Sequence, residues 1–183
     1  MFEIVSTKHI YQGKVINLRA DTICVDSSDQ VVCREIIEHP GSVAIVAIDA
    51  DDNVYLVSQY RHAVSRILME IPAGTLEKGE SSFDTAEREL REEIGMRADY
   101  LVSAGNFYLA PGYSSETMEV YVAKGLSSAP LPRDIDEDIT VHKIPFKKLL
   151  KQVCAGEFSD IKTVTAILLV TLKKELYKPS EIE

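Results

Sequence analysis

Cysteine is scarce in this chain, and its cysteines lack the spacing of a metal or redox site. Cys24, Cys33 and Cys154 are three in number and widely spaced, and no Cys-x-x-Cys pair occurs. This distribution argues against a structural zinc site and against a disulfide framework. We therefore expect reduced cysteines with a structural role, as in a cytoplasmic protein.

Long hydrophobic runs and an excess of positive charge are also missing. No apolar segment approaches a length of about 20 residues, which a membrane-spanning helix needs. The N-terminal residues also show no apolar segment preceded by positive charge, the pattern of a signal peptide. The 29 acidic residues against 20 Lys and Arg give a formal net charge of −9, which disfavours a general binder of nucleic acid or anionic membranes. An anionic small-molecule substrate stays compatible, because bound metal can reverse the local charge.

The composition is that of a soluble globular protein without repeats or low-complexity tracts. Hydrophobic residues make up 45% and charged residues 27% of the 183 residues, enough for one compact domain with a substantial core. The first 40 residues have β-branched content and partial alternation, which is typical of strands. We expect an N-terminal β segment over residues 1–40 and the main domain over residues 41–183.

Hydrophobic periodicity and turn residues predict the secondary structure. Helices are expected from Ser81 or Ser82 to Ile94, over 145–153 and over 160–177, with Gly95 ending the first. Strands are expected at 14–19, 31–38, 43–48, 54–60, 69–72, 100–108, 118–123 and 139–144. Strands before, between and after the helices favour an α+β fold, a sandwich of mixed sheet and helices, over a parallel Rossmann sheet.

The segment 74–96 gathers carboxylates on one short helix behind a glycine loop. Glu89, Glu92 and Glu93 stand at helical spacings of three and four residues, so their side chains share a face. Three acids this close repel one another, and a divalent cation removes that penalty. Ligands that offer only oxygen favour Mg²⁺, Mn²⁺ or Ca²⁺ over zinc or copper.

The residues around these glutamates fit the same chemistry. Arg88 can form an ion pair that fixes a carboxylate such as Glu80 or Glu92. The Ala73-Gly74 backbone leads into the helix through a loop, so the Ala73 carbonyl can also bind metal. Two glycines let that loop turn tightly, Gly74 and Gly79.

Every signature position of the Nudix hydrolases is present in residues 74–96, so the chain resembles that family. The resemblance implies an α/β/α sandwich and hydrolysis of a nucleoside diphosphate linked to another group. It implies Mg²⁺ or Mn²⁺ held chiefly by Glu89 and Glu93, with Glu92 assisting, and it places Arg88 among the catalytic residues. The general physical chemistry agrees, because metal neutralises phosphate oxygens while water attacks phosphorus.

Residues outside the signature are similar to the ADP-ribose pyrophosphatase branch of that family. The matching stretches are Gln59-Tyr60-Arg61, Glu70-Ile71-Pro72-Ala73-Gly74, Ala110-Pro111-Gly112-Tyr113-Ser114-Ser115-Glu116, Gly13-Lys14-Val15 and Arg34-Glu35. Pro111 lies fifteen residues beyond Met96, as the branch requires. The branch implies a homodimer that exchanges its N-terminal β segment and builds nucleotide pockets from both chains.

Carried over by position, the branch assigns substrate contacts. Arg34 and Arg61 would bind phosphate or nucleotide, because the planar guanidinium fork matches phosphate oxygens. Glu116, in the turn that contains Pro111, would accept hydrogen bonds from ribose hydroxyls. Tyr11 would stack on adenine.

The acidic loop 133–138 is expected to supply the base that activates water. In the branch this loop carries two glutamates separated by one residue; the second matches Glu137, but the first matches Ile135. The base could therefore be Glu137, Asp136 or Glu93, or the metal alone could lower the pKa of water. We favour Glu137, which would also contact metal.

The function expected from sequence is Mg²⁺-dependent hydrolysis of ADP-ribose to AMP and ribose 5-phosphate. One alternative is a pyrophosphatase of GDP-mannose or another nucleotide sugar, with the same fold and metals. Another is a non-catalytic sensor that binds ADP-ribose, although such proteins usually lose signature glutamates that this chain keeps. The physiological substrate, the number of metal ions and the phosphorus attacked stay open at this level.

Overall fold

The computed structural model describes residues 2–25, 30–133 and 138–173. Contacts divide the chain into two compact units. One comprises Met1–Ser42 with Phe107–Met118, and the other comprises Val43–Asn106 with Glu119–Glu183.

The first unit is built on an antiparallel sheet of three strands in the order β1-β2-β3. These are β1 (Phe2–Gln12), β2 (Asn17–Val25) and β3 (Val31–Glu38). A turn in which the Gly13 N–H donates to the Ile16 carbonyl (3.0 Å) separates β1 from β2. The strand predicted at 14–19 is therefore wrong in its first half, and β1 was missed.

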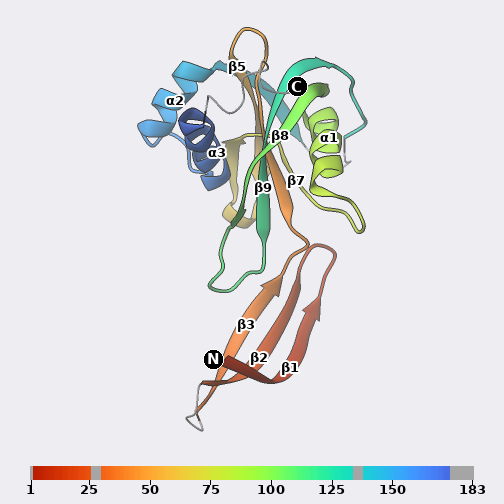
Figure 1. Cartoon of the computed structure of the whole chain (residues 1–183), viewed down its shortest axis with the longest axis vertical. Helices are drawn as coiled ribbons and strands as arrows, with labels where there is room; N and C mark the ends of the chain where they lie inside the picture. The colour runs from red at the N-terminus through yellow and green to blue at the C-terminus, as the bar shows by residue number, and fades with distance from the viewer. Residues whose placement is uncertain (1, 26–29, 134–137, 174–183) are drawn as a thin grey trace. The chain divides into compact units, whose positions relative to one another are not determined.

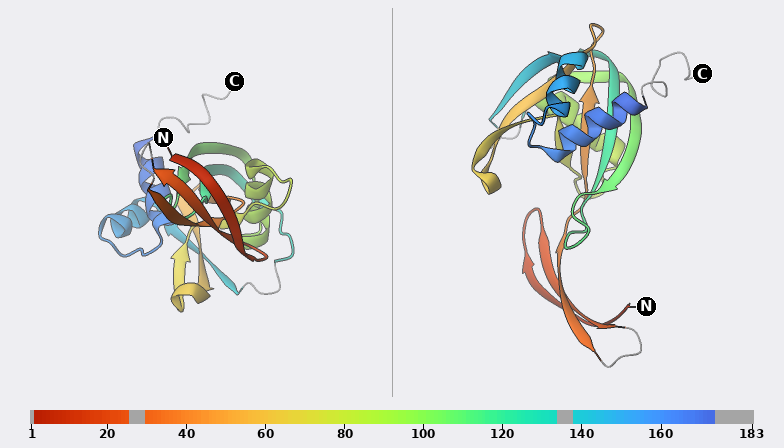
Figure 2. Two further views of the ribbon diagram at one scale, coloured as in Figure 1. Left: turned by 90° about the horizontal axis from the view of Figure 1, so that it is seen from below. Right: turned by 90° about the vertical axis from the view of Figure 1, so that its left-hand side faces the viewer.

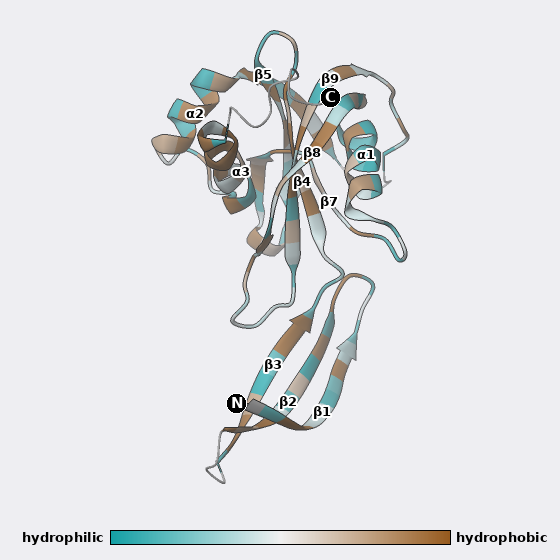
Figure 3. Cartoon of the chain, in the orientation of Figure 1, coloured by the Kyte–Doolittle hydropathy of each residue, from teal (hydrophilic) through white to brown (hydrophobic). Residues whose placement is uncertain are grey.

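The segment 107–118 belongs to this unit because it pairs with the end of β3. The Ile37 N–H donates to the Tyr113 carbonyl at 2.8 Å, and the Ser115 N–H donates to the Ile37 carbonyl at 2.9 Å. Figure 3 shows brown and teal residues mixed along β1, β2 and β3. Many apolar side chains of this sheet are exposed, among them Ile4, Val5, Ile10, Tyr11 and Val31.

In its described residues, the second unit contains two sheets and three α-helices. The sheet orders are β10-β5-β6 and β7-β4-β9-β8. The strands are β4 (Ser42–Ala47), β5 (Asn53–Arg61), β6 (Arg66–Glu70), β7 (Ala73–Thr75), β8 (Met96–Tyr108), β9 (Thr117–Ser128) and β10 (Ile139–Pro145); a 3-10 turn, η1 (His62–Val64), joins β5 to β6. The helices are α1 (Ser82–Glu93), α2 (Phe146–Cys154) and α3 (Ile161–Leu172).

Helices cover these sheets on two sides. Helix α1 lies on one flank, and α2 and α3 lie on the other (Figures 1 and 2). Strand β4 is buried along its whole length, as its continuous apolar sequence predicts. This is the α/β/α sandwich expected from the sequence.

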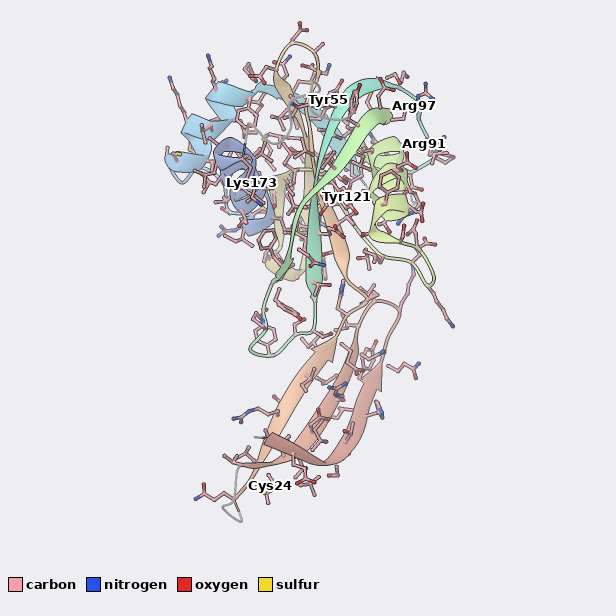
Figure 4. The ribbon with its side chains drawn as sticks, viewed as in Figure 1. Cys24, Tyr55, Arg91, Arg97, Tyr121 and Lys173 are labelled. Atoms are coloured by element: carbon pink, nitrogen blue, oxygen red, sulfur yellow. The ribbon has the colours of Figure 1, made fainter. Side chains whose placement is uncertain are left out.

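Helix α1 follows its sequence signals closely. The Asp84 N–H donates to the Ser81 hydroxyl at 3.2 Å, which caps the first turn, and Gly95 adopts a left-handed φ of 71° just beyond the last. Ala86 and Leu90 are buried in the core, as predicted. Phe83 is 44% exposed, and its ring meets the edge of Tyr121 on β9 (Figure 4).

Two helix starts differ by one residue from the expectation. Pro145 ends β10 and precedes α2, and Asp160 caps α3 by accepting from the Thr163 N–H at 3.0 Å. Residues 174–177 of the expected last helix lie outside the described residues.

Within the described part of the chain, no helix is long and apolar enough to cross a membrane. Cys24 lies on β2 (Figure 4), and Cys33 and Cys154 are free and exposed.

Candidate active site

Arg88 is the hub of the carboxylate helix. Its Nε and Nη2 donate to the two oxygens of Glu80 at 3.0 and 3.1 Å. Its Nη1 donates to Glu89 Oε1 at 2.7 Å and to Glu92 Oε2 at 2.8 Å. The predicted ion pairs from Arg88 to Glu80 and Glu92 are confirmed, and one guanidinium fixes three acids.

Glu80 fastens the entry loop to this hub. It accepts hydrogen bonds from the Glu77 N–H at 3.2 Å and from the Thr85 hydroxyl at 2.8 Å. The hydrogen bonds from Arg88, with those of Thr85 and Glu77, lower the pKa of Glu80 to about 2. Glu80 is therefore ionised at any physiological pH.

Gly74 makes room for Glu89. A Cβ on Gly74 would lie 1.7 Å from Glu89 Oε1, an impossible approach. The sequence assigned both loop glycines to tight turning, but only Gly79 has a left-handed φ, 87°, with no atom near its missing side chain. Gly74 instead lets a nearly buried carboxylate lie directly against the β7 backbone.

Glu93 also faces β7. The Ala73 N–H donates to Glu93 Oε2 at 3.0 Å, and Glu93 is 1% exposed. Because Glu89 and Glu93 are one helical turn apart, their carboxylates occupy the same side of α1. Glu92 lies next to this side of α1, and its carboxylate accepts a hydrogen bond from Arg88.

These residues fit a hard divalent cation in kind. Glu89 and Glu93 offer carboxylate oxygens next to the Ala73–Gly74 backbone, and oxygen donors are what Mg²⁺ and Mn²⁺ prefer. Among the residues that the structure describes, no group of three or more His, Cys, Asp or Glu is arranged to hold a metal ion. Arg88 supplies the positive charge between Glu89 and Glu92 in this arrangement.

The acidic loop is anchored beside α1 through a residue that the sequence did not single out. Arg133 donates from Nε to the Glu92 carbonyl at 3.2 Å and from Nη2 to the Glu93 carbonyl at 2.9 Å. Its Nη1 donates to the Ile139 carbonyl at 2.7 Å. The Arg133 guanidinium thus links both described flanks of the loop to the end of α1. Glu137, the expected base and metal ligand, lies outside the described residues, as do Ile135 and Asp136.

Arg61 is held by a buried acid. Its Nε and Nη2 donate to the two oxygens of Glu70 at 2.9 and 2.8 Å. The hydrogen bonds that Arg61 donates to Glu70 raise the pKa of Arg61 despite its partial burial, and the charge of Glu93 adds to the effect. The Arg61 guanidinium therefore lies in the electric field of a signature glutamate.

The remaining predicted substrate residues belong to the first unit. Arg34 is exposed on β3 and Tyr11 is 58% exposed on β1. Pro111 lies in a turn closed by the Tyr113 N–H on the Ala110 carbonyl at 3.1 Å. Glu116 Oε1 accepts from the Ser42 hydroxyl at 3.0 Å. No local sequence signal marks Ser42 as a partner, because it lies 74 residues away.

The chain matches the NUDIX domain family over residues 38–165. It is 37% identical to an "ADP-ribose pyrophosphatase" of Bacillus subtilis over 94% of both chains, and 35% identical to a "Methanol dehydrogenase activator" of Bacillus methanolicus over the same shares. An "ADP-ribose pyrophosphatase" of Mycobacterium tuberculosis is 37% identical over 92% of this chain and 83% of its own.

A solved structure titled "Crystal structure of ADP compounds hydrolase" superposes with a TM-score of 0.84 at 23% identity, covering 95% of this chain and 94% of its own. That likeness supports the sandwich fold. Together with the family match over residues 38–165 and the intact carboxylate helix, it leads to one assignment: the chain belongs to the NUDIX family.

Proposed function

We propose that this chain hydrolyses the pyrophosphate linkage of ADP-ribose, releasing AMP and ribose 5-phosphate. The observation that carries the proposal is the approach of Glu89 to Gly74, which places a carboxylate against the loop backbone with space for no side chain. Relatives at 37% identity over nearly the whole chain are named ADP-ribose pyrophosphatases, which supports the substrate. Water forms the new bond to phosphorus, and the bridging oxygen leaves with the other phosphate.

Proteins of this family generally need a divalent metal, and we propose Mg²⁺ or Mn²⁺ here. The ligands would be Glu89, Glu92 and Glu93 with the Ala73 carbonyl, joined by Glu137. When bound, such an ion neutralises phosphate oxygens and lowers the pKa of water. Among the chain's own groups, Arg88 orients Glu89 and Glu92.

Glu137 is our proposed base, taking the proton from the attacking water. The anchoring of both loop flanks at the end of α1 by Arg133 supports a role for this loop near Glu93. The sequence alternatives, Asp136 and Glu93 itself, are separable by mutation. Glu137→Gln should lower kcat by about 10²–10⁴-fold if Glu137 is the base.

For the substrate, we propose that Arg61 and Arg34 bind phosphate. Arg34 is suited because it is exposed on β3, where its Nη1 donates a long hydrogen bond to the Cys33 carbonyl at 3.3 Å. Glu116 would accept from ribose hydroxyls, with Pro111 shaping its turn. Tyr11 offers an exposed aromatic ring for adenine.

A substrate panel with matched variants tests the function. Purified protein with Mg²⁺ should release AMP and ribose 5-phosphate from ADP-ribose, and Glu93→Gln should abolish turnover while the circular dichroism spectrum stays unchanged. Asp84→Asn, on the exposed first turn of the same helix, is the matched carboxylate-to-amide control for folding. Full activity of Glu93→Gln would refute the metal site.

The same panel separates the alternatives. Faster turnover of GDP-mannose would identify a different nucleotide-sugar pyrophosphatase, and tight ADP-ribose binding without turnover of any substrate would identify a sensor. The 35% identity to a "Methanol dehydrogenase activator" supports a second candidate function, stimulation of a dehydrogenase. Adding the chain to purified methanol dehydrogenase and measuring its rate tests that candidate.

We also propose a homodimer in the cytoplasm, formed through the N-terminal β segment, residues 1–40. Support comes from the sheet β1-β2-β3, where several large apolar side chains are half or more exposed, as at Ile4, Val5 and Val31. Monomeric proteins rarely leave such side chains clustered in water. The free cysteines Cys33 and Cys154 agree with a reducing compartment.

A further inference from the structure

A closed ring of polar contacts connects β6 with the start of α3. Glu70 Oε2 accepts from Lys162 Nζ at 3.0 Å, and Lys162 Nζ also contacts Asp160 Oδ1 at 2.6 Å. Asp160 Oδ2 accepts from the Thr163 hydroxyl at 2.7 Å. The Thr163 hydroxyl in turn accepts from the Ile71 N–H at 2.9 Å, next to Glu70, which closes the ring.

This ring keeps Glu70 ionised although it is almost fully buried. Burial alone would raise the pKa of Glu70, but the hydrogen bonds from Arg61 and the charge of Lys162 outweigh it and lower that pKa. With 1% of its surface exposed, Glu70 cannot follow a partner toward solvent. A carboxylate fixed on two sides is a rigid anchor for whatever it binds.

The residue that the Glu70 carboxylate holds, apart from Lys162, is Arg61. A guanidinium has five N–H donors, and Glu70 takes two of them along one edge. The Arg61 side chain is 37% exposed, so a phosphate group can reach it from solvent. The charge of Glu93 also raises the pKa of this guanidinium, after the larger effect of Glu70.

We propose that Glu70, braced by Lys162, is a positioning residue that presents the Arg61 guanidinium to a phosphate group of the substrate. This inference rests on the proposed function, because it takes the bound group to be the diphosphate of a nucleotide. Glu70 touches no substrate atom and acts through Arg61. A long arginine that is already fixed loses less conformational freedom when phosphate binds.

The test is a double-mutant cycle on the full-length protein. KM and kcat are measured for ADP-ribose with Mg²⁺, and Kd for ADP-ribose is measured by calorimetry without divalent metal. Arg61→Ala and Glu70→Gln should each raise KM and Kd by about tenfold or more, with a smaller effect on kcat. The double variant should bind no more weakly than Arg61→Ala alone, because Glu70 works through Arg61.

Two further variants separate positioning from charge and from stability. Glu70→Asp keeps the charge but withdraws the carboxylate, and it should also raise KM and Kd. Asp49→Asn makes the same change as Glu70→Gln in a carboxylate that pairs with Lys143 beyond the opposite end of β5. It should lower the melting temperature without changing KM or Kd.

Either of two results overturns the inference: Glu70→Gln with unchanged Kd while Arg61→Ala weakens binding, or additive losses in the double variant. Unchanged Kd in Arg61→Ala also overturns it, because the positioned group would then have no role. Failure of the proposed function looks different. In that case the wild-type chain itself neither binds nor hydrolyses ADP-ribose.

Discussion

Gly74 and Gly79 lie five residues apart and are required for different physical reasons. At Gly74 a methyl group would collide with Glu89, whereas at Gly79 it would meet no atom but would sit on a left-handed backbone. An added methyl group at Gly74 therefore changes the geometry of the site, whereas one at Gly79 changes the stability of the loop.

We expect Gly74→Ala to displace Glu89 and to lower kcat/KM by about a hundredfold, since a misplacement of about 1 Å can cost that much. Steady-state kinetics with ADP-ribose and Mg²⁺ check this. Gly79→Ala is the matched control, which should cost about 1–2 kcal/mol of stability from backbone strain and leave kcat unchanged. Equal kinetic losses in the two variants would contradict the steric role of Gly74.

At the scale of elements, the entry loop and α1 depend on each other through Glu80 and Arg88. The hydrogen bond from Arg88 to Glu80 connects loop residues 76–80 to the helix. Arg88 also donates to Glu92, which connects the loop to the acids of the site. The charge state of one loop residue therefore affects the position of the whole loop.

This coupling predicts a pH dependence of stability. The folded-state pKa of Glu80 is about 2 and lies below its ordinary value of 4.5, so its stabilising effect is complete above pH 4.5 and is lost as pH falls toward 2. Glu80→Gln should cost about 1–2 kcal/mol at pH 7, where a hydrogen-bonded charge is lost. Urea unfolding at several pH values checks this. A difference between wild type and variant that does not shrink between pH 4.5 and 2 would contradict it.

Elements defined by neighbouring residues were predictable from the sequence. Helix α1 was found because its cap at Ser81, its buried face and its stop at Gly95 are all local signals. Strand β1 was missed because its side chains are exposed, so no buried face imposes a strict alternation.

The candidate site was predictable only where its residues share a helix. The bonds of Arg88 to Glu80 and Glu92 follow from spacing along α1 and its loop. The bond of Glu70 to Lys162 joins residues 92 positions apart, and a single sequence carries no record of such distances. Sequence reasoning therefore found Arg61 but not what holds it.

At the scale of the whole molecule, the exposed apolar residues of β1 and β3 bear on assembly. Burying one large aliphatic side chain stabilises by about 1.5–3 kcal/mol, so several together can drive association. We expect Val5→Glu with Ile10→Glu to convert a dimer to a monomer in sedimentation equilibrium. Leu172→Glu, at an 86% exposed position on α3, should leave the dimer intact. A wild-type chain that sediments as a monomer would contradict the proposed assembly.

Under the proposed positioning role, the polar ring between β6 and α3 also determines when during synthesis the nucleotide can bind. Glu70 is the last residue of β6, and Lys162 is the second residue of α3. Because ribosomes make chains from the N-terminus, Glu70 is translated long before Lys162. A nascent chain that already displays the complete carboxylate helix still has no lysine to brace Glu70. Under the same proposal, nucleotide binding waits until α3 has been translated.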